Sequence, residues 1–289
     1  MPSTKDGPPL VDTSRDMEET AWWDLWNSSY RTIDNYDQVS NELFTRASAE
    51  INEIMKTEGG RILEVGCGAG SVSRMLNFST YRGVDMSPAA IAIAQSKNPQ
   101  PPQAGSAKSA LYEVADFHAW PIPSEPFDVV ACVDAISCFR DQRLVLKKFV
   151  QCLRSGGKLV LTTINPFVYW RIRPVWENGP VSHWFSRGEL HMFVKSAGFT
   201  IEKSFTIIPR GNLGILMFIN ARRLNQAFSP GMEKVFRRWK ERVGLGEYRV
   251  LVARKPDHVV RDSLRHRILL NYDSHAPRGE RIRASRHAA

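Results

Sequence analysis

The chain has 289 residues, of which 43% are hydrophobic and 24% are charged. These values are ordinary for a globular protein, so they exclude a chain that is disordered throughout, a collagen and a small disulfide scaffold. The formal charge of +9 would suit nucleic acid, an anionic membrane or an acidic substrate. Residues 1–221 carry 22 Lys/Arg and 23 Asp/Glu, so the whole basic excess lies in residues 222–289. A charge confined to the last quarter argues against nucleic acid as a partner.

The N-terminal sequence MPSTKDGPPLVDTSRD is polar and contains no apolar signal core. It predicts a cytoplasmic protein, with peripheral membrane contact left open, that begins with a flexible segment at 1–17. The most apolar run, 213–219, is far shorter than the roughly 20 residues of a membrane span. The four cysteines form no C-x-x-C pair, so we expect buried reduced thiols and no metal site.

Strand and helix patterns alternate along the chain after a predicted helical cap at 18–58. Short apolar segments typical of strands lie at 61–65, 81–85, 111–115, 127–133, 158–163, 199–208 and 248–254. Helical patterns lie at 71–76, 89–95, 141–153 and 186–197, and Ser87-Pro88 is typical of a helix start. Residues 155–157, S-G-G, read as a break before the fifth strand. This alternation predicts an α/β fold with right-handed crossovers and a mainly parallel sheet.

The strongest local motif is E-V-G-C-G-A-G at residues 64–70, between a predicted strand and a predicted helix. Open α/β sheets bind their ligands at such a place, and glycines let the backbone approach a ligand closely. A dinucleotide site favours G-x-G-x-x-G, whereas here the third glycine comes one residue early. Glu64 would repel a pyrophosphate but would suit a cationic ligand such as S-adenosylmethionine. A tight structural turn is the alternative for these glycines.

Five motifs in order resemble the class I S-adenosylmethionine-dependent methyltransferases. They are E-x-G-x-G-x-G at 64–70, Asp85, Asp116, F-D-V-V at 127–130 and L-R-S-G-G-K-L-V-L at 153–161. The resemblance covers about residues 60–165 and continues weakly through 186–190 and 196–199. It implies a Rossmann-like, seven-stranded, mostly parallel sheet with helices on both faces. An N-terminal helical cap and a C-terminal basic helix and tail would be added to it. The predicted methyltransferase domain is 59–255, with cap inserts at about 165–185 and 210–245.

The resemblance also implies where S-adenosylmethionine, which becomes S-adenosylhomocysteine, would bind. The glycines would line its methionine and ribose, Asp85 would accept the ribose hydroxyls, and Asp116 would accept the adenine amino group. Glu64 would orient the glycine loop or reach the amino group through water, and Phe117 would offer its backbone N–H or stack on the adenine. The full predicted set is Glu64, Gly66, Cys67, Gly68, Gly70, Asp85, Met86, Asp116, Phe117, Val133 and Asp134. For Asp85 the alternative is helix capping, and for Asp116 it is a surface turn.

The residues after the fourth predicted strand constrain the methyl acceptor. Residues 134–137 read D-A-I-S, without the Asn/Asp-Pro-Pro-aromatic motif of amino-methylating nucleic-acid enzymes. Trp22-Trp23-Asp24 and T-I-N-P at 163–166 resemble the ubiquinone-biosynthesis O-methyltransferases, although Ser137-Cys138 replaces their Glu-His pair. We therefore expect a small-molecule acceptor, methylated at a hydroxyl. Two alternatives remain: a membrane-surface lipid or quinone methyltransferase, and a non-catalytic regulatory subunit that binds S-adenosylmethionine.

Aromatic residues in two predicted inserts are typical of a pocket for a planar or apolar acceptor. They are Trp22, Trp26, Tyr30, Tyr36, Phe167, Tyr169, Trp170 and Trp184. The alternative is that these rings pack the cap onto the sheet. His183 is the candidate general base, with a structural histidine as its alternative, and His191 is expected to be structural or exposed.

The basic excess includes an amphipathic segment. Its apolar stripe is Met232, Val235, Phe236, Trp239 and Val243, and its other face carries Lys234, Arg237, Arg238 and Glu241. We expect the stripe to pack on the domain and the basic face to meet solvent. The alternative is weak contact with an anionic membrane. Residues 256–289 are predicted to be a mobile basic tail.

Overall fold

A computed structural model describes residues 38–58, 60–97, 109–169, 183–208 and 230–257. The pocket candidates Trp22, Trp26, Tyr30, Tyr36 and Trp170 lie outside these ranges. So do the predicted N-terminal segment at 1–17 and nearly all of the predicted tail. Within the described ranges, no helix is both long and apolar enough to cross a bilayer.

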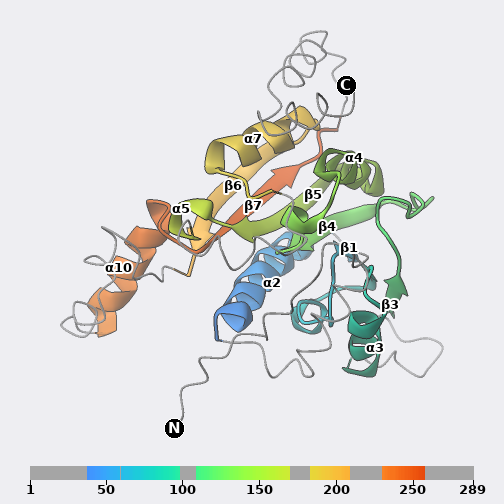
Figure 1. The fold of residues 1–289 in the computed structure, drawn as a ribbon, viewed down its shortest axis with the longest axis horizontal. Coiled ribbons are helices and arrows are strands. Elements are labelled where there is room, and N and C mark those ends of the chain that lie inside the picture. Colours follow the sequence, from blue (N-terminus) through green and yellow to red (C-terminus); the bar gives the residue numbers. More distant parts are fainter. Residues whose placement is uncertain (1–37, 59, 98–108, 170–182, 209–229, 258–289) are drawn as a thin grey trace, which may run out of the picture.

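Seven strands form one mostly parallel sheet, as predicted, in the order β3-β2-β1-β4-β5-β7-β6 (Figure 1). Only β7 is antiparallel to its neighbours, β5 and β6. The strands are β1 Arg61–Val65, β2 Thr80–Asp85, β3 Ser109–Val114, β4 Phe127–Val133, β5 Leu153–Ile164, β6 Thr200–Ile207 and β7 Tyr248–Arg254. The strand order reverses at β1, between β2 and β4, and open α/β sheets bind ligands at such a switch point. The glycine motif follows β1 directly.

The described helices cover both faces of the sheet. They are α2 Gln38–Glu58, α3 Pro88–Lys97, α4 Gln142–Cys152, α5 Pro166–Tyr169, α7 Arg187–Ser196 and α10 Pro230–Arg242. Helix α3 begins as predicted, because the Ser87 hydroxyl accepts from the Ala90 amide at 3.1 Å. Helix α7 begins with a capping box between Ser186 and Glu189.

Two predicted boundaries were wrong. The helix expected at 71–76 is only a 3-10 turn at Ser73–Met75. The Asn52 side chain from α2 binds the Met75 carbonyl and the Asn77 amide there, each at 2.8 Å, and so ends the turn. Strand β5 begins at Leu153 and runs through the S-G-G segment that was read as a break. Gly156, at φ +75°, lets the strand pass through an irregularity opposite Phe127–Val129 instead of stopping.

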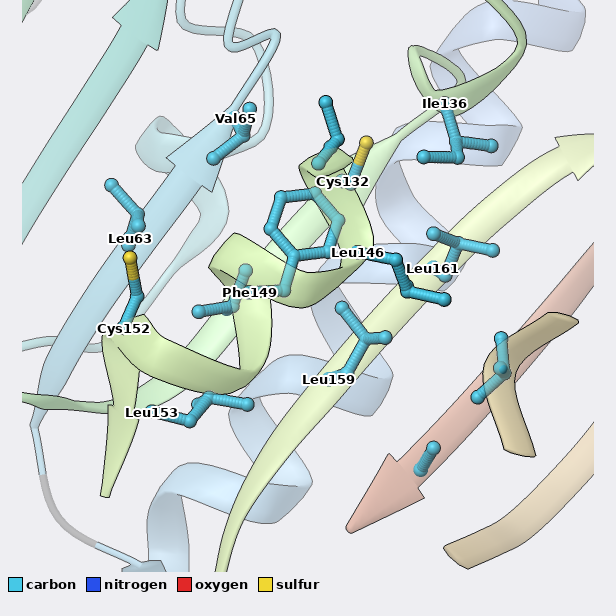
Figure 2. Packing of buried hydrophobic residues seen from close by; sticks show 14 of the residues in the cluster. Leu63, Val65, Cys132, Ile136, Leu146, Phe149, Cys152, Leu153, Leu159 and Leu161 are labelled. Carbon is cyan, nitrogen blue, oxygen red and sulfur yellow. The ribbon is translucent and has the colours of Figure 1, made fainter. Parts of the chain in front are cut away.

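Each face of the sheet has its own hydrophobic core. Residues of α2 and α3 pack on one face, and residues of α4 and α7 pack on the other. Figure 2 shows the second core, in which Phe149 of α4 lies fully buried among Leu63, Cys132 and Leu159. Cys67, Cys132 and Cys152 are buried free thiols, as expected, and desolvation raises their pKa values. Cys138 is also a free thiol but is only half-buried, which differs from the expectation. No group of metal-ligating side chains occurs among the described residues.

Helix α10 packs differently from the prediction. Part of its charged face turns inward: Lys240 and Glu241 are buried, Glu241 pairs with Arg46 at 3.1 Å, and Arg237 pairs with Glu42. Lys234 and Arg238 are exposed, as predicted. The described apolar stripe turns outward, with Val235 61%, Trp239 46% and Val243 51% exposed. The ion pairs with α2, and not the apolar stripe, determine which face of α10 packs on the domain. The periodicity of a single helix does not show such partners.

Candidate functional site

The glycine loop is held against β2 and leaves one face uncovered. The amides of Gly66 and Cys67 both donate to the Val84 carbonyl, at 2.8 and 3.3 Å. Gly66, Gly68 and Gly70 have φ values of +74°, +50° and +72°, the left-handed region that glycine tolerates best. A Cβ at Gly66 would meet the Ala135 Cβ at 2.4 Å, whereas a Cβ at Gly68 would meet nothing within 4 Å. Gly66 is thus required for packing, and Gly68 leaves room for a ligand close to the backbone.

Asp85 joins the end of β2 to this loop. Its carboxylate accepts from the Gly68 amide at 2.8 Å and from the Ser87 amide at 3.0 Å. The cap of α3 is supplied by Ser87, so capping does not account for Asp85. Met86, the next residue, is half-buried. The carboxylate is held in one orientation beside the uncovered face of Gly68, where a ribose hydroxyl could reach an acceptor.

Glu64 lies under the loop and does not present a charge to a ligand. It is 1% exposed and accepts a hydrogen bond from the Tyr81 hydroxyl at 2.5 Å. Burial raises its pKa to about 8, so the protonated form predominates at neutral pH. The expectation that an ionised Glu64 repels a pyrophosphate was therefore wrong. Its hydrogen bond ties β1 to Tyr81 of β2, and the predicted role of orienting the loop stays a prediction.

A second polar contact beneath the loop was not predicted. The Ser73 hydroxyl donates to the Gly70 carbonyl at 2.9 Å and lies 2.8 Å from the Tyr112 hydroxyl. The Tyr112 ring in turn packs against Tyr81, with centroids 5.4 Å apart. These contacts fix the third glycine from below, and only the tertiary fold brings the three residues together.

Asp116 is ionised at the start of a turn that follows β3. Desolvation works to raise its pKa, but the amide and ring of His118, each 2.9 Å away, together with Arg140, lower it. Phe117 is 2% exposed and stacks on Trp120 in the core, so its ring cannot cover an adenine. Of its two predicted roles, only the backbone contact fits this position.

Lys148 on α4 holds that turn in place. Its ammonium donates to the carbonyls of Phe117 at 2.6 Å, of His118 at 2.9 Å, and of Trp120. The residue is 7% exposed. Its role was not predicted. A lysine on the apolar face of an amphipathic helix could have indicated a buried ammonium group with polar partners. By binding three carbonyls, Lys148 fixes the backbone that carries Asp116.

Asp134 follows β4 with a strained backbone. Its φ is +55°, and its amide donates to the Thr162 hydroxyl at 2.8 Å. Desolvation raises the pKa of its carboxyl to about 7. Its neighbour Ala135 contacts Gly66, so Asp134 lies beside the glycine loop, next to the buried Val133. A strained residue with a perturbed carboxyl at a strand end is a common property of functional sites.

The predicted acceptor side lies next to β5. The hydroxyls of Ser137 and Thr163 are 2.9 Å apart, and the His183 amide donates to the Ser137 carbonyl at 3.4 Å. The His183 side chain is half-exposed, 3.9 Å from Glu189. Phe167 is 64% exposed, so it does not pack against the described part of the sheet. The indole N–H of Trp184 is buried and has no hydrogen-bond partner within the described ranges. The Tyr169 side chain is outside the described set.

This sheet order, with a glycine loop and a carboxylate at the switch point, defines a class I S-adenosylmethionine-dependent methyltransferase. A sequence model of the family described as "Methyltransferase domain" matches residues 39–204, more than half of the chain. The chain belongs to this family, which confirms the resemblance. S-adenosylmethionine is the cofactor of the class, and the uncovered face of Gly68 and the oriented Asp85 fit it.

Two curated relatives illustrate the sequence similarity. Phthiotriol/phenolphthiotriol dimycocerosates methyltransferase of Mycobacterium leprae is 29% identical over 137 residues, which is 46% of this chain and 47% of the relative. Ubiquinone biosynthesis O-methyltransferase of Pseudomonas fluorescens is 32% identical over 148 residues, which is 50% of this chain and 58% of the relative. The chain spans about half the length of the curated relatives it matches.

Solved structures support the fold at low sequence identity. An S-adenosylmethionine-dependent methyltransferase of Thermotoga maritima has a TM-score of 0.53 and 18% identity, covering 82% of this chain and all of that chain. Magnesium protoporphyrin IX methyltransferase of Synechocystis, solved with S-adenosylhomocysteine, has a TM-score of 0.52 and 14% identity, covering 82% and 95%. At these identities the likeness establishes the fold alone.

Proposed function

We propose that this protein transfers a methyl group from S-adenosylmethionine to a hydroxyl oxygen of a small-molecule acceptor. The observation that carries the proposal is the position of Asp134, which follows β4 with a backbone φ of +55° beside the glycine loop. Burial also raises the pKa of its carboxyl to about 7. A hydroxyl acceptor needs a group that takes up its proton, and a base is most effective when its pKa lies near the working pH. The name of the Pseudomonas relative supports oxygen as the acceptor atom.

Each end of the cofactor would meet a different part of the chain. When bound, S-adenosylmethionine supplies a methyl group on a positively charged sulfur, which is open to in-line displacement. Asp85 would bind the ribose, and Asp116, fixed by Lys148, would bind the adenine amino group. Gly66, Gly68 and Gly70 would line the remainder with backbone. Asp134 would accept the proton of the acceptor hydroxyl.

Asp134 is a better base than His183, the predicted one. His183 is half-exposed, and its ring lies edge-on to Phe185 and near Glu189. Asp134 follows β4, the neighbour of β1, and so lies beside the glycine loop. The methyl donor would bind at that loop. The two residues therefore give a matched pair for testing the reaction.

Methyl transfer to a panel of phenols and alcohols, detected as S-adenosylhomocysteine release, tests the proposal. Wild type should methylate at least one hydroxyl compound, with a rate that rises with pH through about 7 as Asp134 loses its proton. Asp134→Asn keeps a residue that tolerates positive φ and should lower kcat by about 100-fold. His183→Gln should stay near wild type. Cofactor binding without transfer to any compound would favour the regulatory-subunit alternative, and transfer to amines alone would contradict O-methylation.

We further propose that the outward face of α10 contacts an anionic membrane surface. Val235, Trp239 and Val243 are exposed on it, and the basic residues Lys234, Arg238 and Arg242 are exposed beside them. An apolar strip flanked by cations is the composition of a helix that lies in a lipid interface. Arg237 belongs to the inward face, because it pairs with Glu42 and Glu241.

Co-sedimentation with phosphatidylglycerol vesicles tests this contact. We expect binding that is lost in Trp239→Ser and in the pair Arg238→Ala/Arg242→Ala. The pair Arg143→Ala/Lys147→Ala, exposed on α4, should leave it unchanged. Equal binding by all variants would contradict the proposal. So would a dimer, seen by light scattering, that Trp239→Ser dissociates, because a second copy would then cover this face.

A further inference from the structure

Arg249 is a buried arginine that lies at the carboxyl ends of the parallel strands, the same end of the sheet as the glycine loop. It is the second residue of β7 and stands opposite Thr163 of β5 and Thr206 of β6. Because β7 is antiparallel to β5, its first residues lie beside the last residues of β5. The carboxyl ends of the parallel strands β1 and β4 reach the same edge. Arg249 therefore lies on the acceptor side of the proposed site.

The guanidinium of Arg249 is incompletely paired. The residue is 6% exposed, and one terminal nitrogen donates to the Asn165 side-chain oxygen at 3.2 Å. Its Nε is buried and has no hydrogen-bond partner among the described residues. The side-chain amide group of Asn165 donates to the carbonyls of Gly244 and Gly246. The neutral Asn165 oxygen thus satisfies one of the five N–H groups that an arginine presents.

No carboxylate among the described residues forms an ion pair with Arg249. Other arginines of the sheet, such as Arg61, Arg82 and Arg154, are more exposed, and each has an acidic partner. Arg249 is thus a buried arginine that lacks a counter-ion within the described part of the chain. Leaving a charge buried and unpaired costs several kcal/mol as a rule, so such a group points to a function.

The charged groups around Arg249 are of the same sign. Burial and Arg187, the first residue of α7, lower the pKa of Arg249 to about 10. Burial, Arg187, Arg249 and Lys195 lower the pKa of His191. His191 lies on α7, 2.8 Å from the Ser204 hydroxyl of β6. Two cationic arginines, with a histidine that is mostly neutral at pH 7, thus lie around the first residues of β7. An anion would relieve the repulsion between the two arginines, and the neutral histidine could donate a hydrogen bond to it.

We infer that Arg249, with Arg187 and His191 around it, binds an anionic oxygen group, a carboxylate or phosphate, carried by the methyl acceptor. The planar fork of arginine binds such groups through two parallel hydrogen bonds. The identity of the ligand rests on the proposed methyl transfer, whereas the binding of an anion does not.

The sheet sets the length of such an acceptor. Strand β5 lies between β4 and β7, so two strand spacings, about 10 Å, separate the strand that ends at Asp134 from the strand that carries Arg249. A molecule with a hydroxyl at one end and an anionic group at the other, such as a hydroxylated aromatic acid, spans this distance.

Calorimetric titration of the full chain with benzoate, phenyl phosphate and neutral benzamide tests the inference, with and without saturating S-adenosylhomocysteine. Wild type should bind at least one of the two anions and not benzamide, and preference between the anions identifies the group. Arg249→Gln, which retains a donor for Asn165, should weaken anion binding at least tenfold without changing S-adenosylhomocysteine affinity. Arg154→Gln, an arginine paired with Asp128 at 2.7 Å, should bind the anion as wild type does.

Three results would overturn the inference: no anion binding by wild type, equal binding of benzamide, or unchanged anion binding in Arg249→Gln. If Arg249→Gln does not unfold cooperatively, Arg187→Gln on the exposed start of α7 replaces it, with a several-fold loss expected and no loss contradicting the site. Failure of wild type to bind S-adenosylhomocysteine would refute the proposed function. The titrations with the two anions in the absence of cofactor would even then test whether Arg249 binds an anion.

Discussion

The backbone amide of Gly68 donates to the carboxylate of Asp85 at 2.8 Å, joining the loop after β1 to the end of β2. The two residues are 17 positions apart, and each was predicted separately to bind the cofactor. The hydrogen bond makes them one unit: the loop orients the carboxylate, and the carboxylate fixes the loop in its left-handed conformation. A ligand therefore meets both groups already in place, which reduces the ordering that binding must bring about.

The glycine loop offers a matched pair of substitutions. Gly66→Ala should lower the free energy of unfolding by about 2 kcal/mol or more, because its Cβ would meet the Ala135 Cβ at 2.4 Å at a φ of +74°. Gly68→Ala meets no atom and should cost only about 1 kcal/mol, yet weaken S-adenosylhomocysteine at least tenfold. Urea unfolding and calorimetry separate the two effects. Equal cofactor affinity in Gly68→Ala and wild type would contradict a ligand over that face.

Lys148 should act on cofactor affinity through the Asp116 turn. Lys148→Met leaves the carbonyls of Phe117, His118 and Trp120 without their donor, and each buried unsatisfied group costs about 1–3 kcal/mol. We expect affinity for both adenosine and S-adenosylhomocysteine to fall about tenfold, and Lys148→Arg to restore part of it. Calorimetry at a temperature where all variants are folded measures this.

Lys255 is the control for Lys148. It also donates to two backbone carbonyls, those of Val150 and Leu153, but these lie where α4 ends and not in the Asp116 turn. Lys255→Met should lower stability and leave adenosine affinity unchanged. The same loss of affinity in both variants would mean that α4 stability, and not the turn, determines binding.

Glu64 should make the protein less stable as pH rises. Its pKa is about 8 in the folded state and near 4.5 when unfolded, so between these values the folded state binds more protons than the unfolded state. The free energy of unfolding must then fall with increasing pH over that window, by on the order of a few kcal/mol. Glu64→Gln keeps a group that can accept from Tyr81 and should remove most of this slope. Melting temperatures from pH 5 to 8 test it, and an unchanged slope would contradict the assignment.

Local signals in the sequence predicted the sheet and the cofactor loop. Short apolar runs, a glycine-rich loop and a Ser-Pro helix start are each recognised within a few residues. The seven strands, the loop at 64–70 and the start of α3 at Ser87 could therefore be predicted. Contacts between residues far apart in the sequence could not be predicted from it. Lys148 binds carbonyls 28 to 31 positions away, and α10 takes its orientation from Glu42 and Arg46, nearly 200 positions earlier.

The protonation state and the burial of individual side chains could not be predicted from the sequence either. The pattern treats Glu64 as a charge, because burial and the Tyr81 hydrogen bond are properties of the folded chain. Phe117 was expected either to stack or to offer backbone, and only the packing against Trp120 decides between these. Arg249 lies in an ordinary strand pattern. That it has no counter-ion in the described part of the chain is visible only once its neighbours on β5, β6 and α7 are assembled.

The most direct test of the cofactor site is calorimetric titration with S-adenosylmethionine and S-adenosylhomocysteine of wild type, Asp85→Asn and Asp128→Asn. Asp128 is the matched control, since its carboxylate also accepts from a backbone amide, that of Arg61 at 2.9 Å, but at the amino end of β4. Hydrogen bonds to a charged acceptor contribute about 1.5–3 kcal/mol each, so Asp85→Asn should lose at least tenfold in affinity. Asp128→Asn should bind as wild type does. No binding of either ligand by folded wild type, or equal binding by all three proteins, would contradict the cofactor site described for this chain.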